Sequence, residues 1–256
     1  MTEKYIIIAI TGIIQSWGAP STLNPNSGSP RNSYGVPTLS GLTGCINSAL
    51  GIKRGEESPV DPNKLKIVIR EDVTPTFNRD YQIAQNHHHG FRAPESATKE
   101  IPKIFLEEGS YLVAMGYNHK NGEHVINMIE EALNNPHYAP YYGRRAHVPL
   151  IHSLLGSIKT DNPVKWIKEA PLITTKINQN NIRKIYSNIP ISDSRTINQK
   201  DVPTSTNPKT RKFKERSIYI TQTHKTPETN YEEKYGILAG VEKIKNLIGE
   251  TVNVYQ

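Results

Sequence analysis

The chain contains three consecutive histidines, His87, His88 and His89. Histidine is the side chain that most readily transfers protons near neutral pH. Beside a phosphodiester, such groups could cleave RNA without a metal ion, by acid and base work on a 2′-hydroxyl. Metal binding is a second chemistry open to them, but three neighbouring side chains cannot all reach one ion from a regular element, and no cysteine cluster accompanies them. Because no spacing in the sequence forces catalysis, we expect no catalytic residue, no metal and no other cofactor.

Two arginines in a row, Arg144 and Arg145, follow a pair of tyrosines and Gly143. A guanidinium presents two parallel N–H donors that fit a phosphate, so this turn could hold a nucleic-acid backbone while Tyr142 shapes the turn. The alternative is that both arginines are solvated or paired with carboxylates. We favour the phosphate contact and keep the alternative open.

A second basic stretch lies nearer the carboxyl end of the chain. Between positions 195 and 216 there are seven Lys or Arg residues, including Arg211 and Arg216, against two acidic residues. Phe213 and Tyr219 are interleaved at strand spacing, which suits a track for single-stranded nucleic acid as well as an ordinary solvated face. The whole chain has a formal net charge of +7, which favours a polyanionic partner such as nucleic acid.

Length and composition limit the class of protein. At 256 residues the chain can form one large domain or two small ones. Its single cysteine, Cys45, excludes an internal disulfide and fits a reducing compartment. The apolar stretch 5–14 is too short to span a bilayer and lacks the flanks of a signal peptide. We therefore expect a cytoplasmic protein that does not contact a membrane.

The hydrophobic periods predict the elements that must position these residues. Buried strands are expected at 5–10, 65–70 and 111–117, and amphipathic helices at 40–52 and 124–133. The order strand, helix, strand, strand, helix resembles the opening of a ferredoxin-like split βαβ unit. A fourth strand would follow.

Two further segments add to this body. About forty residues separate the second and third strands, too many for a structureless loop, so 76–104 is expected to form a projecting hairpin or arm. Arg79, Arg92 and the three histidines lie in it, which predicts a basic arm. Near the end of the chain, 231–249 has helical spacing with Gly249 as a stop. That helix would pack on its own body or dock a neighbouring subunit.

Three blocks of sequence resemble, in the right order, the CRISPR-associated Cas-five family in the form carried by type I-E Cascade complexes. The first is IIQSWGAP with YGVPTLSGLTGCINSALGIKR, the second HVINMIEEALNNPHYAPYYGRRAHVPL, and the third RTINQKDVPTSTNPKTRKFKERSIYIT. Together they cover most of the chain from residue 5 to residue 221. The segment after residue 221 departs from the family pattern.

The resemblance implies an α+β fold with a ferredoxin-like, RRM-like body of the RAMP type at 1–75 and 105–221. It also implies a β-hairpin thumb at 76–104, with 222–256 as a helical extension. The implied function is that of a non-catalytic subunit of a ribonucleoprotein complex for antiviral defence. It would cap the 5′ handle of the CRISPR RNA, contact the backbone and large subunits, and meet target DNA only through the complex. Relatives in type I-C systems cut precursor CRISPR RNA, so a metal-independent endoribonuclease is the alternative.

The polar stretch between the first strand and the first helix could cradle a bent RNA strand, or it could be an ordinary surface connection. The amino end of the helix would attract a phosphate, and Tyr34 would stack on a base, while Trp17 is as readily a core residue. The residues expected at the RNA are Trp17, Gly18, Ser33, Tyr34, Thr38 and Ser40 in this stretch, Arg79, His87, His88, His89 and Arg92 in the thumb, and Tyr142, Arg144, Arg145, Arg211 and Arg216 in the basic segments.

Overall fold

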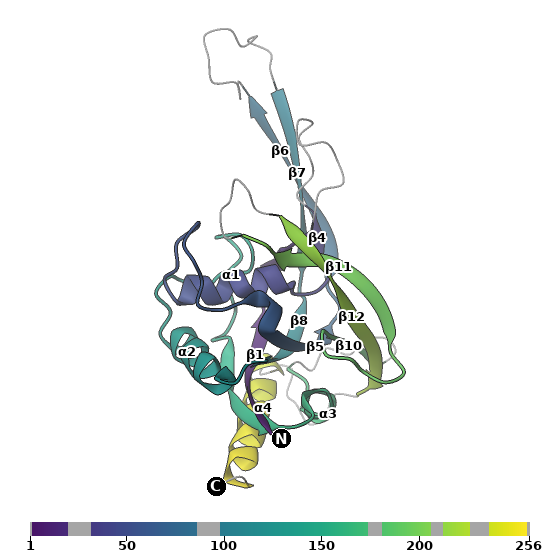
Figure 1. Cartoon of the computed structure of the whole chain (residues 1–256). Helices are drawn as coiled ribbons and strands as arrows, with labels where there is room; N and C mark the ends of the chain where they lie inside the picture. The colour runs from purple at the N-terminus through teal and green to yellow at the C-terminus, as the bar shows by residue number, and fades with distance from the viewer. Residues whose placement is uncertain are drawn as a thin grey trace.

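The computed structural model describes residues 2–19, 32–85, 98–173, 181–205, 212–225 and 236–254. A mixed α/β body is built on one seven-stranded antiparallel sheet, with two helices on each face (Figure 1). Across the sheet the strands are β11 (Arg195–Pro203), β12 (Phe213–His224), β10 (Ile182–Ser187), β5 (Leu65–Val73), β8 (Ser110–Tyr117), β1 (Glu3–Thr11) and β9 (Leu154–Thr160).

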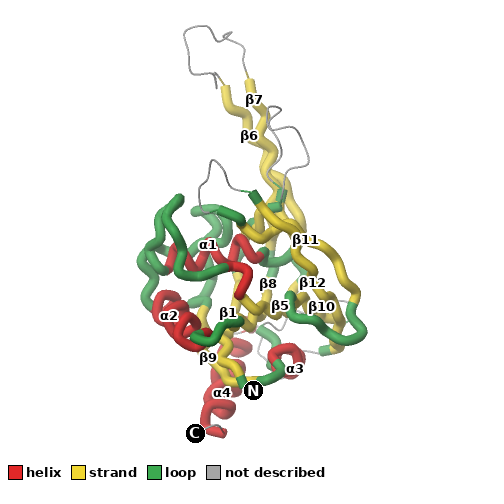
Figure 2. The backbone as a smooth tube through the Cα atoms, in the orientation of Figure 1, coloured by secondary structure: helices red, strands yellow, loops and turns green. Residues whose placement is uncertain are grey.

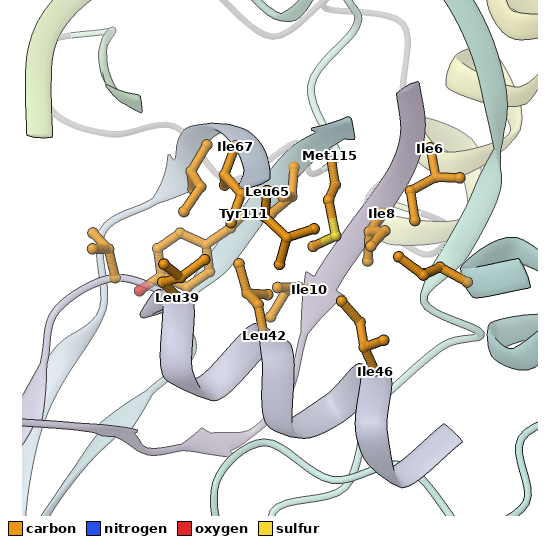
Figure 3. Close-up of a cluster of buried hydrophobic side chains, with 14 of the residues drawn as sticks. Ile6, Ile8, Ile10, Leu39, Leu42, Ile46, Leu65, Ile67, Tyr111 and Met115 are labelled. Carbon is orange, nitrogen blue, oxygen red and sulfur yellow. The ribbon is translucent and has the colours of Figure 1, made fainter. Parts of the chain in front are cut away.

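The strand β1 is buried on both faces, as its unbroken apolar sequence predicts. Ile6, Ile8 and Ile10 point to the face covered by α1 (Leu39–Ala49) and α2 (Gly122–Asn134), because side chains alternate along a strand. Figure 3 shows Ile10 beside Leu42 of α1, with Ile8 and Ile6 following along the strand. The predicted strands and helices of this part of the body are therefore confirmed, with their ends shifted by a few residues.

The opposite face of the sheet is covered by α3 (Pro163–Glu169) and α4 (Gly236–Val254). Val241, Ile244 and Ile248 of α4 are buried against it, so the carboxyl-terminal helix packs on its own body. A Cβ atom at Gly240 would lie 2.4 Å from the carbonyl oxygen of Ile173, which shows how closely the helix backbone approaches. The predicted stop at Gly249 is wrong. The helix continues to Val254 because a solvent-facing glycine lowers helix propensity without blocking the helical hydrogen bonds.

A long hairpin of β6 (Thr76–Gln85) and β7 (Thr98–Glu107) projects from the body, where an arm is predicted (Figures 1 and 2). Its base is widened by the short strand β2 (Ile14–Gln15), which pairs with β7. The short strands β3 (Trp17–Gly18) and β4 (Ser33–Tyr34) pair nearby, and a 3-10 turn, η1 (Pro62–Lys64), precedes β5.

The prediction of a basic arm is not met by the described strands of the hairpin. The basic residues of β6 and β7 are Arg79, Lys99 and Lys103, and the acidic ones are Asp80, Glu100 and Glu107. Among the described residues, no helix is long and apolar enough to cross a membrane, and no three His, Cys, Asp or Glu side chains are grouped to hold a metal ion.

Candidate nucleic-acid interface

The turn that carries the paired arginines packs directly on the QSWG segment. The backbone N–H of Ser16 donates to the carbonyl oxygen of Tyr142 at 3.0 Å, and the Trp17 and Tyr142 rings lie 5.5 Å apart. Gly143 has φ +85°, and a Cβ atom there would lie 1.9 Å from the Ser16 carbonyl oxygen. Only glycine fits this turn, because both its backbone conformation and its neighbour exclude a side chain.

The two aromatic rings of this junction belong to the core. Trp17 is fully buried, and its indole N–H donates to the side-chain oxygen of Gln15 at 3.0 Å. Tyr142 is also buried, and its hydroxyl lies 2.8 Å from that of Ser153. Neither ring can stack on a base in this conformation, so the structure corrects the expectation that Trp17 and Tyr142 contact RNA. Both position the turn instead.

The two arginines of the turn have different environments. Arg144 is half-buried and donates from Nη2 to the carbonyl oxygen of Ile104 in β7 at 3.0 Å, which ties the turn to the hairpin. Arg145 is exposed. His147 is buried just beyond them, and burial, together with the charge of Arg144, lowers the pKa of His147. Arg145 is therefore the better placed of the two arginines to meet a phosphate.

The amino end of α1 already holds an anion from its own chain. Thr38 caps the helix by accepting from the Gly41 N–H at 3.1 Å, and the Leu39 N–H donates to Asp201 Oδ2 at 2.7 Å. Asp201 in turn accepts from Arg216 Nε at 2.7 Å and from its Nη2 at 2.9 Å. A carboxylate of β11 thus occupies the place where a phosphate is predicted.

The residues predicted around that helix end are correspondingly unavailable. Thr38 and Ser40 are buried, and their hydroxyl oxygens lie 3.3 Å apart. Arg216 offers its fork of donors to Asp201, so it is neither a free phosphate contact nor part of a solvated face. The structure corrects the expectation for these three residues, because local capping and a distant carboxylate satisfy them.

The loop at β4 keeps some polar surface. Ser33 Oγ accepts from the Trp17 N–H at 2.8 Å and donates to the Tyr34 carbonyl oxygen at 3.0 Å, so this hydroxyl supports the loop. Gly18 is exposed, with open space around it. Tyr34 is half-buried, and burial raises its pKa while a backbone hydrogen bond with Lys200 acts in the opposite direction. Part of the Tyr34 ring is left at the surface beside β11.

One face of the hairpin carries an exposed row of side chains that we name the aromatic face: Phe77, Arg79 and Tyr81. Phe77 is 56% exposed and Tyr81 49% exposed, and the guanidinium of Arg79 lies 5.6 Å from the Tyr81 ring centre. They share a face because alternate residues of a strand point the same way. Only Arg79 of this row is among the predicted site residues. The alternation of aromatic and basic residues in TFNRDY is the sequence signal that points to the other two.

The root of the hairpin is held on both faces. On the aromatic face, a Cβ atom at Gly35 would lie 3.2 Å from the Phe77 ring, and the Tyr111 hydroxyl donates to the Gly35 carbonyl oxygen at 2.6 Å. On the other face, the rings of Phe105 and His147 meet edge to face at 6.4 Å. The structure thus brings Tyr34, the aromatic face and the Arg145 turn to one end of the body. His87, His88, His89, Arg92 and Arg211 lie outside the described residues.

Comparison with known proteins places this geometry in a family. Residues 5–219 match the family model for CRISPR-associated protein (Cas_Cas5). The "CRISPR system Cascade subunit CasD" of Escherichia coli (strain K12) is 30% identical over 175 residues, which is 64% of this chain and 75% of that protein. A chain of a "CRISPR RNA-guided surveillance complex" superposes with a TM-score of 0.71 at 25% identity, covering 93% of this chain and 99% of that one.

A second solved structure, titled "Crystal structure of Cas protein", has a TM-score of 0.62 at 21% identity and covers 89% of this chain and 100% of that one. It shows the same fold. The helix α4 lies beyond the residues that match the family model. The resemblance seen in the three sequence blocks is confirmed, and the chain belongs to the CRISPR-associated Cas5 family.

Proposed function

We propose that this chain is a subunit of a type I-E CRISPR surveillance complex and that it binds the 5′ handle of the CRISPR RNA in the cytoplasm. Its family, and the printed names of the relatives, support membership of such a complex. The observation that carries the RNA-binding part is the aromatic face, an exposed Phe-Arg-Tyr row on a projecting hairpin. Exposed aromatic rings flanked by cationic groups are the usual means of holding single-stranded RNA.

Each group has a distinct part in this proposal. Phe77 and Tyr81 offer ring faces on which splayed bases stack, and Arg79 adds its charge over the Tyr81 ring. Arg145 offers a planar fork to a backbone phosphate at the hairpin root. Contacts of this kind read RNA shape and backbone rather than sequence, and target DNA is read by the guide through base pairing.

The body itself is proposed to be ferredoxin-like, with RRM-like topology, and the hairpin to be its thumb. The order β5-β8-β1-β9 supports this, since the strands appear as second, third, first and fourth along the chain, and every neighbouring pair is antiparallel. In this reading 1–75 and 105–221 form the body and 76–104 the thumb. The thumb would also contact the neighbouring backbone subunit, and the large subunit would contact the body.

A purely binding role is proposed over RNA cleavage. Acid and base cleavage needs titrating groups that reach the scissile phosphate. At the root of the hairpin, on the side opposite the aromatic face, His147 is buried and the Tyr142 hydroxyl is engaged with Ser153, so neither group is offered to a ligand. The histidines at 87–89 lie outside the described residues, so the endoribonuclease alternative depends on experiment.

The decisive experiment incubates the pure protein with labelled repeat RNA in EDTA and scores both binding and cleavage. We expect saturable binding with no cleavage product. Replacing Phe77 and Tyr81 together with Ala should weaken binding, whereas replacing Leu238, an exposed residue of α4, with Ala should not. Cutting at one position in EDTA, lost when His87, His88 or His89 is changed, would establish the endoribonuclease instead. No difference between the two substituted proteins would remove the aromatic face from the RNA site.

A further inference from the structure

A buried polar cluster lies on the α3 and α4 face of the sheet, away from the predicted RNA-binding residues. At its centre, Arg70 of β5 is fully buried and paired with Asp72, with Nε 2.5 Å from Oδ1 and Nη2 2.9 Å from Oδ2. Its remaining donors reach the carbonyl oxygens of Ile167, Ala170 and Pro171, each at 2.6 Å. All the N–H groups of Arg70 are therefore satisfied, by Asp72 of its own strand and by the carbonyl oxygens of α3 and the residues that follow it.

A second arginine of the cluster, Arg183 of β10, has no such set of partners. Its side chain is 0% exposed, and among the described residues its Nε and Nη2 have no hydrogen-bond partner. Its Nη1 lies 3.4 Å from the Ile182 carbonyl oxygen, a long contact. It shares a face with Ile185, which pairs with Arg70 across the sheet, so the two arginines are neighbours.

The nearby carboxylates are already engaged. Asp72 accepts from Arg70 and from the Ile173 N–H at 2.8 Å. Glu71 points to the other face of the sheet, where it accepts from Thr74 and Tyr186. Both carboxylates favour the charged form of Arg183 at longer range, while burial and Arg70 lower its pKa. The guanidinium stays charged, because its ordinary pKa lies far above neutral pH.

An unpaired acceptor lies two residues away, at the residue just before β10. Asn181 Oδ1 is buried and has no hydrogen-bond partner among the described residues. The residue is held at φ +51°, a conformation that Asn tolerates better than most residues. Three N–H donors of Arg183 and one acceptor of Asn181 thus remain unpaired within one short stretch of β10 and its approach. Buried polar groups are normally satisfied, so this stretch is built to meet a ligand that both accepts and donates.

We propose that Arg183 and Asn181 form a binding site for a small protonated oxyanion, hydrogen phosphate. Two phosphate oxygens would accept from Nε and Nη2 of Arg183, the side-on fork that guanidinium groups make with oxyanions. A phosphate O–H would donate to Asn181 Oδ1. Hydrogen phosphate keeps a proton at neutral pH, whereas sulfate has none, so the acceptor selects phosphate over sulfate. The bound anion would join β10 to the Arg70 cluster beneath α3.

Thermal unfolding of the full chain tests this site, in phosphate, sulfate or chloride at pH 7 and matched ionic strength. The melting temperature of the wild type should rise by about 5 °C at a phosphate concentration one hundred times Kd, and by less in sulfate. Arg183→Met should abolish the phosphate-specific rise. Asn181→Gly, which suits the positive φ, should keep anion binding but lose the preference for phosphate. Arg195→Met, which removes an exposed arginine of β11, should behave as wild type.

Calorimetric titration of the wild type with phosphate and with sulfate gives a second measurement that needs no variant. Heat of binding for phosphate that exceeds that for sulfate supports the site. Equal stabilisation by the two anions that survives Arg183→Met would be a general salt effect and would overturn the proposal. The proposal would also be overturned if phosphate left the wild type unchanged while Arg183→Met lowered its stability. In that case water or the chain itself would satisfy Arg183.

Discussion

The carboxylate of Asp201 joins two parts of the body, and its removal should be costly. Asp201 is fully buried and accepts four hydrogen bonds, from the Leu39 N–H, from Gln199 Nε2 at 2.9 Å and two from Arg216. Asp201→Asn keeps the volume but removes the charge and replaces one acceptor by a donor. Breaking one side of a buried ion pair costs about 3–5 kcal/mol. The Arg216 side chain is 13% exposed, so solvent partly compensates its charge, and we expect Asp201→Asn to lower the free energy of unfolding by about 3 kcal/mol, the low end of that range.

The assay is urea unfolding of the wild type, Asp201→Asn, Arg216→Met and the double variant, followed by circular dichroism. A loss of about 3 kcal/mol corresponds to roughly 6–12 °C in melting temperature for a chain of this size. The double variant should lose less stability than the sum of the two single losses, and the difference should be about 1 kcal/mol or more. The reason is that Arg216→Met removes the charge that Asp201→Asn leaves unpaired. Losses that simply add, or a loss below about 1 kcal/mol for Asp201→Asn, would refute the reasoning.

Three further predictions concern the proposed RNA interface and the turn beside it. Arg145→Ala should flatten the slope of log K against log salt for handle RNA by about 0.7, measured by filter binding, and an unchanged slope would exclude a phosphate contact. Phe77→Ala and Tyr81→Ala should each weaken RNA binding by about 1–3 kcal/mol in the same assay, and affinities equal to that of the wild type would argue against stacking. Because the pKa of His147 is lowered in the folded chain, the unfolded chain binds more protons at acidic pH. The stability of the wild type should therefore fall relative to that of His147→Gln as the pH drops below 6.5. Unfolding midpoints of the two proteins that change in parallel from about pH 7.5 to 5.5 would contradict this.

The parts of the fold that the sequence predicts are those coded by local pattern. The unbroken apolar run of β1 is buried on both faces of the sheet, and the helical spacing of α1 defines the one face that it buries. The hairpin was predicted from the length of its segment, since so long a loop is rare in a compact body. Helical spacing alone predicts α4, but its predicted stop at Gly249 is wrong and its predicted start at 231 lies outside the described residues.

The details of the site depend on contacts between distant residues, which no local pattern encodes. Asp201 fills the amino end of α1 from 162 positions away, and Trp17 packs on Tyr142. Reasoning from Thr38 alone therefore predicts a free helix end where the folded chain places a carboxylate, and for Trp17 it leaves the core and the RNA contact equally open. The aromatic face is a different case, because the alternation of Phe77, Arg79 and Tyr81 is visible in the sequence.

In this chain, residues of the QSWG and YYGRR motifs tie the arginine turn to the root of the hairpin. Gly143 lets the turn close against Ser16, and from that turn Arg144 reaches the Ile104 carbonyl oxygen of β7. A stacking surface holds RNA only if its rings stay where the bases arrive, because each ring ordered on binding subtracts entropy from the affinity. A rigid root therefore favours tight binding by an exposed arm. In the function proposed here, the buried motif residues position the arm, and the exposed residues of the arm supply the contacts to RNA.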